Sequence, residues 1–420
     1  MSISPHIVAD AQVIVVGGGP AGASTSYFLA RAGVDVLLLD RSRFPRDKVC
    51  SEYMSPEASR ILSAMDALCA VEDSGAARLS GMRVHAPNGR TIHGEFAAAH
   101  GYRGFRDRGL AVRRTILDSI LLERAMSAGV RVEEGIRVTD IERDASGRVS
   151  GVVTTGEGAA TIRRAALVVG ADGLRSVVGR RLNLIRASRW PRRIALVTHY
   201  TGVEGMRGYG EMHVDRGGYC GLADVGGGLT NVAVVVPVSR APDVAVDRTE
   251  FLESWIAERP AIAAMFGRAT RVAPVRATGP FASSARRAWT SGAALVGDAA
   301  DFFDPFTGEG IYAALRGGEI AAPFFAESVD AAARGGDGDS PLRAYERARR
   351  AEFAGKWKVE RMVGAAVAFP SLINRAATVL SRRRDMADLF VGVVGDFVPA
   401  REVLKPMYLF NLMFSPSTRA

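Results

Sequence analysis

The sequence predicts an α/β fold in which a Rossmann-like domain is interleaved with an antiparallel β-sheet domain and is followed by C-terminal helices. Three observations carry this prediction. A glycine-rich turn at residues 17–22 joins an apolar run to a helical segment. Four short β-branched runs lie between residues 194 and 236, and a later apolar run ends on Asp298. Alternating strands and helices are typical of a parallel sheet, whereas successive strands are typical of an antiparallel one.

The first forty residues have the order strand, turn, helix, strand and acid. Residues 13–16 are apolar, and Gly17-Gly18-Gly19-Pro20-Ala21-Gly22 follows at once. Gly17 permits a tight turn, Gly19 allows a pyrophosphate to approach, and Gly22 allows the helix to pack close to the strand. The free N–H groups at the start of this helix favour phosphate. Asp40 ends the second apolar run, where it can accept a hydrogen bond from a ribose hydroxyl.

The composition is that of a soluble globular protein with room for two domains. The chain has 420 residues, of which 48% are hydrophobic and 24% are charged. The net charge of +9 comes almost entirely from scattered arginines, and no zinc-finger or RNA-binding signature accompanies it. We therefore expect no nucleic-acid partner, although the charge could attract anionic substrates or lipid head groups.

The cysteines, the apolar runs and the histidines bear on the cellular compartment, on a membrane span and on a metal site. Cys50, Cys69 and Cys220 form no C-x-x-C pair, which fits a reducing cytoplasm. The first nine residues carry no signal-peptide pattern, and no run approaches the roughly 20 apolar residues that span a bilayer. We therefore expect a cytoplasmic protein. The six histidines are dispersed without metal-ligand spacing, so we expect no metal site.

The remaining elements follow in order from periodicity and turn residues. Residues 41–55 are polar and irregular, and Pro87-Asn88-Gly89 indicates a hairpin turn. Before residue 180 we expect helices at 57–71 and 115–128, hairpin strands at 79–86 and 90–96, a β-meander at 136–163 and a buried strand at 167–170. After it we expect strands at 194–201, 211–214, 219–223, 230–236 and 293–298, helices at 251–266, 310–329 and 341–367, and an apolar tail broken by prolines.

The chain has a second apolar strand that ends on an acid. A nicotinamide dinucleotide would need little more than the first turn, so the second strand predicts a longer ligand. Asp298 is followed by Asp304-Pro305-Phe306-Thr307-Gly308-Glu309-Gly310-Ile311. Asp298 could hold a polyol hydroxyl, and a helix that begins after the Gly308–Gly310 turn could face a ring carbonyl. The dipole of that helix would favour negative charge on the ring. The ligand that combines ribose, pyrophosphate, polyol and such a ring is FAD.

At this point the sequence resembles a known family. The Gly17–Gly22 turn with Asp40, residues 170–173 (G-A-D-G) and residues 297–298 (G-D) resemble the three motifs of FAD-dependent oxidoreductases of the aromatic-hydroxylase structural class. Residues 304–311 (D-P-F-T-G-E-G-I) and 44–50 (F-P-R-D-K-V-C) resemble the version found in the geranylgeranyl reductase family. The resemblance covers roughly residues 10–330, with the motifs in family order.

The resemblance implies a role for each matching residue. The glycine turn would meet the pyrophosphate, Asp40 with Arg41 the adenosine ribose, and Val138 the adenine through its backbone. Arg113 would hold the ribityl or phosphate side, Asp172 would tie its strand end to the cofactor region, and Gly310 with Ile311 would meet the flavin carbonyl. The implied cofactor-binding set is Gly17, Gly19, Ala21, Gly22, Asp40, Arg41, Arg113, Val138, Asp172, Asp298, Gly308, Gly310 and Ile311.

The resemblance also implies how the chain divides into domains. Residues 1–78, 110–183 and 286–340 would form the FAD-binding domain. Residues 79–109 and 184–285 would form the substrate-binding domain, and residues 341–420 a C-terminal helical segment. The apolar tail of this segment, which carries three consecutive arginines at 382–384, could make a peripheral membrane contact or cover the pocket as a lid. The oligomeric state is left open.

Two departures from the family pattern bear on the substrate. Ser51 stands where the family usually has a glycine. Tyr219-Cys220-Gly221-Leu222-Ala223 stands where isoprenoid reductases have Y-x-W-x-F-P. This substitution favours a shorter or more polar molecule than a long prenyl chain. His199, His213 and Cys220 are further candidates to face the substrate.

The first function hypothesis is a flavin reductase of carbon–carbon double bonds in a hydrophobic, isoprenoid- or polyketide-like molecule, with Cys50 as a candidate proton donor. The second is a flavin monooxygenase that hydroxylates an aromatic or polyketide-like substrate. A halogenase is a weaker alternative, since the four tryptophans are isolated. A peptide-modifying maturation flavoprotein is another less favoured alternative, which the motifs do not exclude. No second nucleotide fingerprint is present, so NAD(P)H or another external donor would supply electrons.

Overall fold

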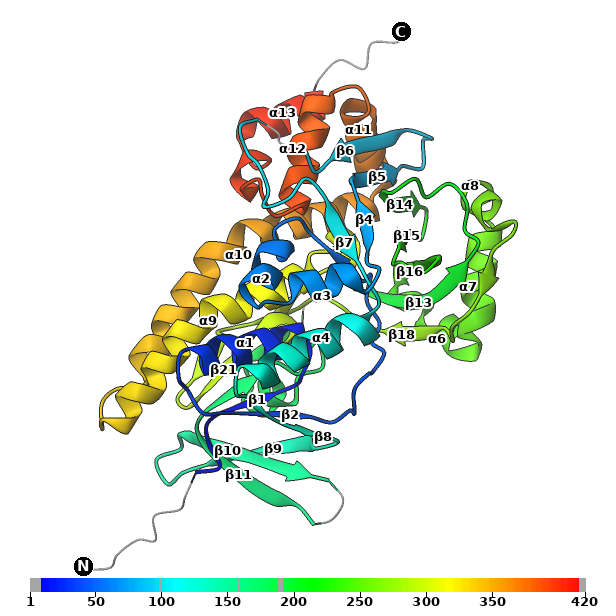
Figure 1. Cartoon of the computed structure of the whole chain (residues 1–420). Helices are drawn as coiled ribbons and strands as arrows, with labels where there is room; N and C mark the ends of the chain where they lie inside the picture. The colour runs from blue at the N-terminus through cyan, green and yellow to red at the C-terminus, as the bar shows by residue number, and fades with distance from the viewer. Residues whose placement is uncertain (1–8, 98–99, 157–158, 188–191, 415–420) are drawn as a thin grey trace, which may run out of the picture.

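The computed structural model describes residues 9–97, 100–156, 159–187 and 192–414. A parallel sheet forms the lower half of the molecule in Figure 1. Strand β1 (Ala11–Val16) lies between β2 (Val36–Asp40) and β11 (Thr161–Gly170), and both neighbours run parallel to it. Every residue of β2 is buried, as expected for a strand covered on both faces. The strand order is β20 (Trp289–Thr290), β21 (Ala293–Leu295), β11 (Thr161–Gly170), β1 (Ala11–Val16), β2 (Val36–Asp40) and β8 (Arg131–Glu134).

Helices α1 (Pro20–Arg31), α4 (Arg114–Ser127) and α9 (Gly310–Ala333) accompany this sheet (Figure 1). Helices α1 and α9 touch closely, because the Ser24 hydroxyl donates to the Ala314 carbonyl at 3.4 Å. A Cβ atom at Gly318 would lie 2.2 Å from Ser24 Oγ, so glycine is required at this crossing. The contact fixes the N-termini of two helices that the sequence predicts to face the same ligand.

The predicted meander and the buried strand that follows it are confirmed, and they share one strand. Strands β9 (Arg137–Arg143) and β10 (Val149–Thr155) pair antiparallel with each other, and β10 pairs with the first half of β11. The second half of β11 enters the parallel sheet beside β1. A single ten-residue strand therefore serves both sheets.

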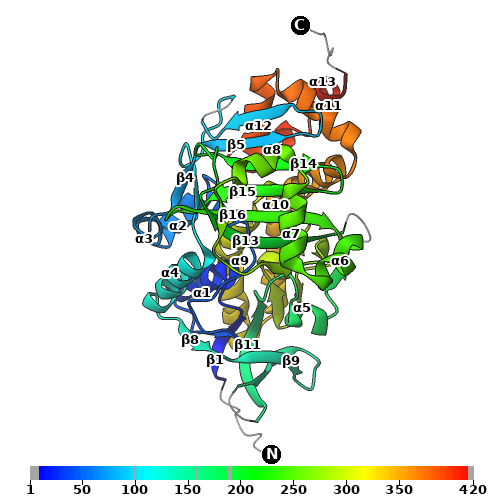
Figure 2. The same ribbon diagram turned by 90° about the vertical axis from the view of Figure 1, so that its right-hand side faces the viewer.

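A second sheet contains the predicted antiparallel strands and the predicted hairpin. Helix α7 (Arg248–Ala257) lies across one face of this sheet, with α6 (Ala241–Val246) nearby (Figure 2). Leu252 and Trp255 of α7 pack against Leu196 and Val232 of the strands. The strand order is β17 (Thr270–Arg271), β13 (Arg193–Thr201), β16 (Leu229–Pro237), β15 (Gly218–Asp224), β14 (Gly210–Asp215), β5 (Gly81–His85) and β6 (Thr91–Glu95), with β18 (Arg276–Thr278) on β13.

Two small sheets connect the large ones. One has the order β3 (Tyr53–Met54), β7 (Gly109–Ala111) and β4 (Ala77–Leu79). The other has the order β12 (Ile185–Ala187), β19 (Ser283–Ala285) and β22 (Asp301–Phe302). Both lie where the chain passes between the parallel sheet and the antiparallel sheet.

Two predicted helices are wrong as single elements. Residues 57–71 form α2 (Ala58–Ala64) and α3 (Leu68–Asp73), separated at Asp66, whose φ of 55° is left-handed and ends the first helix. Residues 251–266 are divided between α7 and α8 (Pro260–Ala263). Pro260 has no N–H to continue the earlier helix, so it starts a new one.

The C-terminal segment is helical, as predicted. It contains α10 (Asp339–Ala368), α11 (Pro370–Leu380), α12 (Arg384–Val394) and α13 (Pro406–Phe414). Helix α12 lies on the hairpin, where Glu95 N donates to Asp388 Oδ1 at 3.1 Å. Among the described helices none alone is long and apolar enough to cross a bilayer, although α10 and α11, bent by 110° at their junction, meet that criterion as a pair.

Candidate cofactor and substrate site

The glycine turn after β1 is as tight as the sequence predicts. Gly17 has φ 104°, and a Cβ atom there would lie 2.6 Å from the Ala171 carbonyl oxygen. A Cβ at Gly22 would lie 1.7 Å from the Gly17 carbonyl oxygen, so this position must be glycine. Helix α1 begins at Pro20 with no side-chain cap at Gly19. Its first N–H groups are therefore open to an anionic ligand.

Asp40 fixes this turn from behind. Its Oδ2 accepts from Gly18 N at 2.7 Å, and its Oδ1 accepts from Ser42 N at 2.7 Å. Ile136 N donates to the Asp40 carbonyl at 2.9 Å, which brings the strand that carries Val138 to the same end of the sheet. Val138 is buried and Arg41 is exposed. None of Asp40, Arg41 and Val138 lines the main pocket, so their predicted adenosine contacts stay predictions.

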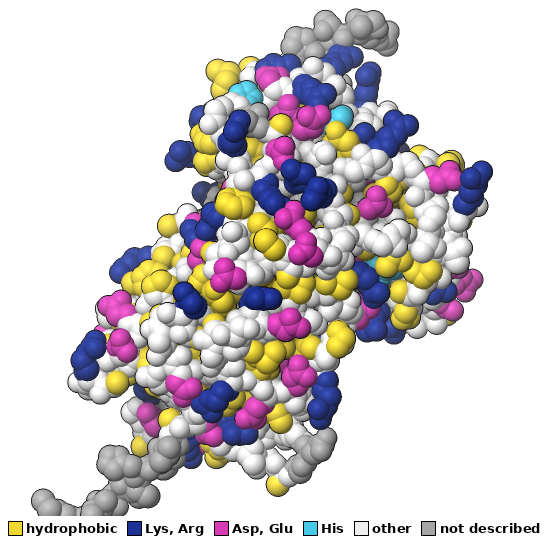
Figure 3. All heavy atoms as spheres, in the orientation of Figure 1, with side chains coloured by type: hydrophobic (Ala, Val, Ile, Leu, Met, Phe, Trp, Pro, Cys, Tyr) yellow, Lys and Arg dark blue, Asp and Glu magenta, His cyan; other side chains and the backbone are white. Residues whose placement is uncertain are grey.

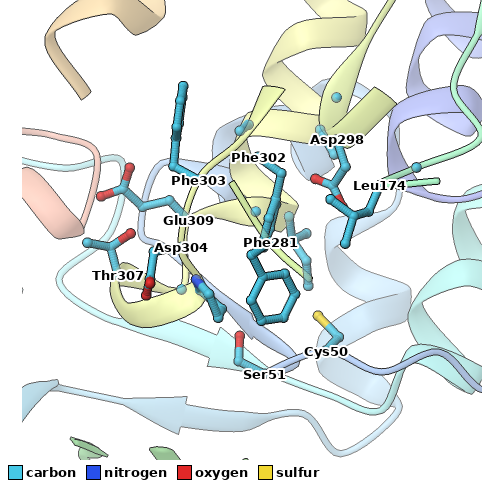
Figure 4. Close-up of a pocket in the computed structure, with 18 of the residues that line it drawn as sticks. Cys50, Ser51, Leu174, Phe281, Asp298, Phe302, Phe303, Asp304, Thr307 and Glu309 are labelled. Carbon is cyan, nitrogen blue, oxygen red and sulfur yellow. The ribbon is translucent and has the colours of Figure 1, made fainter. Parts of the chain in front are cut away.

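A large pocket lies between the parallel sheet and the antiparallel sheet. Its empty space, including the open solvent at its mouth, is about 1750 Å³. Figure 4 shows Asp298 at one end of the drawn group and Glu309 and Thr307 at the other. The pocket brings together six of the predicted cofactor residues, namely Gly19, Ala21, Asp298, Gly308, Gly310 and Ile311.

Arg114, the neighbour of the predicted Arg113, lines this pocket beside the glycine turn. Arg113 Nη2 lies 3.6 Å from Asp47 Oδ2 and is not a lining residue. Arg114 is buried, and its guanidinium donates two hydrogen bonds of 2.7 Å to Asp118. It begins α4, so its side chain is held beside the glycine turn. Sequence reasoning missed Arg114 because a one-residue shift in a helix start moves the side chain to another face.

Asp172 caps a helix rather than reaching into the pocket. Its Oδ1 accepts from Ser176 Oγ at 2.6 Å and its Oδ2 from Val177 N at 2.6 Å, at the start of α5 (Val177–Arg181). Its neighbours Ala171 and Gly173 do line the pocket. The Asp172 carboxylate therefore holds the strand end that borders the pocket, and it does so through hydrogen bonds to other protein groups. This is consistent with the predicted role of Asp172 in tying that strand end to the cofactor region.

Asp298 lies among cations inside the pocket. Burial raises the pKa of its carboxyl, while the charges of Lys48 and Arg114 act in the opposite direction. Burial lowers the pKa of Lys48, and the nearby Arg114 adds to this effect. Sequence reasoning missed Lys48 as a site residue, although it lies within the F-P-R-D-K-V-C motif two residues before Cys50. This acid with two bases offers both donors and acceptors to a polyol or a phosphate.

Cys50 lines the pocket, on a loop pinned by the buried Glu52 (Figure 4). Glu52 Oε1 accepts from Arg114 N at 2.9 Å, while its Oε2 contacts His199 Nε2 at 2.7 Å and accepts from Asn231 Nδ2 at 3.0 Å. His199 therefore serves this link between the two large sheets and does not face the substrate. The loop carries Cys50 between them.

Cys220 and His213 do not face the pocket either. Cys220 is fully buried on the other side of β15, where burial raises the pKa of its thiol to about 12. Its neighbours Tyr219 and Gly221 point to the pocket. His213 lies beside His85 and Glu211 on the outer face of β14. The sequence indicates no such cluster because strand pairing, not residue spacing, brings these side chains together.

The turn before α9 is anchored to the antiparallel sheet. Gly308 has φ 72°, and a Cβ there would lie 2.9 Å from the Tyr53 ring. Asp304 accepts from the Tyr219 hydroxyl at 2.7 Å and forms an ion pair with the buried Arg193. Helix α9 begins at Gly310 with no side-chain cap, so its N-terminus is open to the pocket. A ring held there would have a fixed position relative to the sheet.

A group of buried acids borders the same end of the pocket. Lys356 Nζ lies 3.7 Å from Glu309 Oε2 and also contacts Asp396. Burial raises the pKa of Glu309 against the effect of Lys356. Burial, together with the charge of Glu309, raises the pKa of Glu360 well above its ordinary value. Sequence reasoning missed Glu360, although it lies four residues after Lys356 on the same face of α10, where both line the pocket.

The walls of the remaining space are apolar. Small side chains of the antiparallel sheet form one wall, and aromatic side chains form another. The small ones are Ala195, Val197, Gly221, Ala233 and Val235, and the aromatic ones are Phe281, Phe302, Phe303, Phe353 and Trp357. Of the C-terminal segment only α10 contributes to the lining, so the described tail from residue 369 to residue 414 is not a lid over this pocket.

A family model described as the FAD binding domain matches residues 10–358. The chain belongs to this FAD-binding family. It is 30% identical over 319 residues to a digeranylgeranylglycerophospholipid reductase of Methanosarcina acetivorans, covering 74% of each chain. It is 30% identical over 339 residues to a menaquinone reductase of Mycobacterium tuberculosis, covering 74% of this chain and 76% of the relative. The structure of a flavin-dependent brominase shares its fold, with a TM-score of 0.78 at 20% identity over 94% of this chain and 97% of the other.

The residues of this FAD-binding protein fit the cofactor. Two uncapped helix N-termini, those of α1 and α9, open onto one pocket, and the glycine turn leaves no room for a Cβ at Gly17 or Gly22. Asp298 lies on the lining between these two helix ends. Along its lining, from α1 to α9, the pocket therefore offers an anion site, then a polyol partner and then a ring site. The protein is an FAD-dependent oxidoreductase, as the sequence predicts.

Proposed function

We propose that this FAD-dependent oxidoreductase reduces carbon–carbon double bonds of a hydrophobic, isoprenoid- or polyketide-like small molecule. The observation that carries the proposal is the apolar cavity beside the start of α9, which has a partly buried acid, Glu360, in its wall. Double-bond reduction needs a hydride for one carbon and a proton for the other. The names of the two relatives, which are reductases, support the same reaction class.

FAD, when bound and reduced, supplies the hydride. The chain's own residues supply position and the proton. The open N-terminus of α9 holds the ring end, and the ion pair of Asp304 with Arg193 keeps that turn at a fixed distance from the substrate wall. Aromatic side chains exclude water from the apolar part of the cavity. Glu360, whose raised pKa keeps it protonated at higher pH than an ordinary glutamate, is the proposed proton donor.

Cys50 is the alternative proton donor. It lies in the same lining, and its Sγ accepts from Glu52 N at 3.3 Å. Replacing Cys50 by alanine and by serine separates the two assignments. If Glu360 donates the proton, both variants keep most of the reduction rate, whereas Glu360→Gln loses it.

The reaction is tested with the purified, FAD-loaded chain under anaerobic conditions. Dithionite supplies electrons, and geranylgeranyl lipids and menaquinone serve as probe substrates. We expect a product heavier by two hydrogen atoms for each double bond reduced. In air, oxygen uptake matched to a hydroxylated product would replace the proposal with the monooxygenase reaction, and bromide- or chloride-dependent products would replace it with halogenation.

We also propose NAD(P)H as a transient electron donor. The proposal is supported by the single glycine turn, which FAD would occupy, so that a nicotinamide would bind without a fingerprint of its own. Mixing NADPH or NADH with the oxidised protein should bleach the flavin absorbance. If neither does so but reduced ferredoxin does, the donor is a protein.

A further inference from the structure

Three metal-binding side chains meet outside the cofactor pocket. His85 lies on β5, and Glu211 and His213 lie on β14. The two strands pair in parallel, with His213 opposite His85 and Glu211 opposite Arg83. Met212, between the two β14 residues, faces the pocket. Because side chains alternate along a strand, Glu211 and His213 face the opposite side of the sheet.

The donor atoms of this cluster converge on one point. Glu211 Oε2 lies 3.0 Å from His85 Nε2 and 3.2 Å from His213 Nε2. One ligand atom from each of the three residues lies within 4.8 Å of the others. The two imidazole rings are stacked, with centroids 4.3 Å apart and an angle of 9° between their planes. Both Nε2 atoms thus approach the same carboxylate oxygen from the same side.

One of these nitrogen atoms lacks a hydrogen-bond partner. The His213 side chain is only 9% exposed, and its Nε2, although near the carboxylate, is not aligned for a hydrogen bond and has no other partner among the residues that the structure describes. A buried ring nitrogen in this state is costly. A metal ion would accept the lone pair of this nitrogen and so remove the cost. A histidine that was already hydrogen-bonded to the glutamate would not need such a partner.

The neighbours of the cluster orient its ligands. His85 Nδ1 lies 3.0 Å from Thr91 Oγ1 on β6, a contact that can hold the proton on Nδ1 and leave Nε2 free. Arg83 Nη1 lies 3.4 Å from Glu211 Oε1, so Oε2 is left for the histidines. The Glu211 side chain is only 4% exposed, so its carboxylate is held in place between Arg83 and the two histidines. The positive charge of Arg83 faces the same carboxylate and reduces its attraction for a cation.

We propose that His85, Glu211 and His213 form a site for one divalent transition-metal ion, with zinc the best match. Two imidazoles and one carboxylate are a three-ligand set that zinc takes in proteins, with water in the fourth position. The one-third exposed side chain of His85 leaves a path for the ion from solvent. The ion would fasten β5 to β14 and so hold the hairpin on which α12 rests. This site is separate from the FAD pocket and does not depend on the proposed reaction.

The test uses the full-length, FAD-loaded protein after tag removal and treatment with a chelator. It is dialysed against micromolar ZnCl₂, and bound zinc is measured by elemental analysis and by titration calorimetry. We expect one zinc per chain and a higher melting temperature with zinc than without. His213→Ala and Glu211→Gln each remove a direct ligand, so each should lower zinc affinity by more than the roughly 10- to 100-fold that the loss of an outer-shell partner costs, and should remove the melting shift.

His93→Ala is the matched control. His93 lies on β6 of the same sheet, and its side chain is 34% exposed, as is that of His85. This variant should bind zinc like the parent protein. Flavin absorbance and circular dichroism show whether each variant is folded, and His85→Ala provides a second test should His213→Ala fail to fold. Zinc binding that is absent at micromolar concentration, or that survives both histidine variants, would overturn the site.

Discussion

Glu360 lines the pocket close to Glu309 and Lys356, and its environment predicts how stability depends on pH. Its pKa is about 4.5 in the unfolded chain and well above that in the folded one. Between those two values the folded state binds more protons than the unfolded state, so this group lowers stability as pH rises through that range. Glu360→Gln removes the effect. We expect the variant to melt higher than the parent at pH 8 and no differently at pH 4.

The same substitution should remove the proposed acid. We expect double-bond reduction by Glu360→Gln to fall about 100-fold or more, with FAD affinity and flavin reduction unchanged. Parent activity should be lost as pH rises through the raised pKa of Glu360. Glu123→Gln, an exposed position on α4, serves as the control. Equal reduction rates in parent and Glu360→Gln protein would eliminate Glu360 as the donor.

Asp298, which lines the pocket, is the proposed partner of the polyol chain of FAD. Asp298→Ala should weaken FAD binding roughly 10- to 100-fold, because a hydrogen bond to a charged group contributes about 1.5–3 kcal/mol. Asp298→Asn keeps the shape and one acceptor, so its loss should be smaller. Equilibrium dialysis with FAD measures both. An affinity unchanged in Asp298→Ala would place the polyol elsewhere.

Part of the site was predictable residue by residue, and part was not. Asp298 and Gly310 could be assigned because each follows a recognisable strand or turn. Arg114, Glu52 and Glu360 could not. Their roles depend on a helix starting one residue earlier than expected, on a loop crossing to another sheet, and on a long helix with no motif. These are tertiary facts that local sequence does not encode.

At the level of elements, the junction of β1 with α1 allows the sharpest test. Gly22→Val places a Cβ 1.7 Å from the Gly17 carbonyl oxygen, so the helix must move away from the turn. We expect purified Gly22→Val protein to lack flavin absorbance even with added FAD. Gly267→Ala is the control, because a Cβ there meets only the Ala264 carbonyl oxygen at 3.9 Å. Normal flavin content in Gly22→Val would mean that this turn does not hold the cofactor.

Element types were predictable where a pattern was long, and element ends were not. The glycine turn and both large sheets match the expectation because β-branched runs and glycines mark them. The helices at 57–71 and 251–266 are each broken in the structure, at Asp66 and at Pro260. Pro260 was a visible warning in the sequence. The left-handed conformation of Asp66 was not, because packing selects it.

On the scale of the whole molecule, exposed apolar side chains gather on the last helix. Met407, Phe410 and Phe414 of α13 are each more than half exposed, as is Phe369 at the start of α11. Basic side chains are spread over the face in Figure 3 among acidic ones, and hydrophobic side chains reach the surface at its C-terminal end. We propose that α11 and α13 contact a membrane surface, with the basic residues facing anionic lipid.

Vesicle sedimentation tests this contact. The parent protein should sediment with vesicles that contain anionic phospholipid and less with neutral ones. The triple variant Met407→Ser, Phe410→Ser and Phe414→Ser should remain in solution. Val246→Ser with Val272→Ser removes exposed apolar side chains elsewhere and should sediment like the parent. No difference between the two variants would argue against a membrane contact at α13.

The bonds of Glu52 have one more consequence. A single buried carboxylate holds Arg114 of one sheet's helix and His199 and Asn231 of the other sheet. Because Glu52 joins the two sheets at this point, they cannot move apart to admit a thicker substrate without leaving the buried carboxylate unpaired and away from water. We therefore expect the pocket to select substrates by their thickness. Flat or narrow molecules should bind and bulky ring systems should not, whereas the length of the substrate toward the pocket mouth should matter little. Glu52→Gln, with its weaker bonds, should relax that thickness limit.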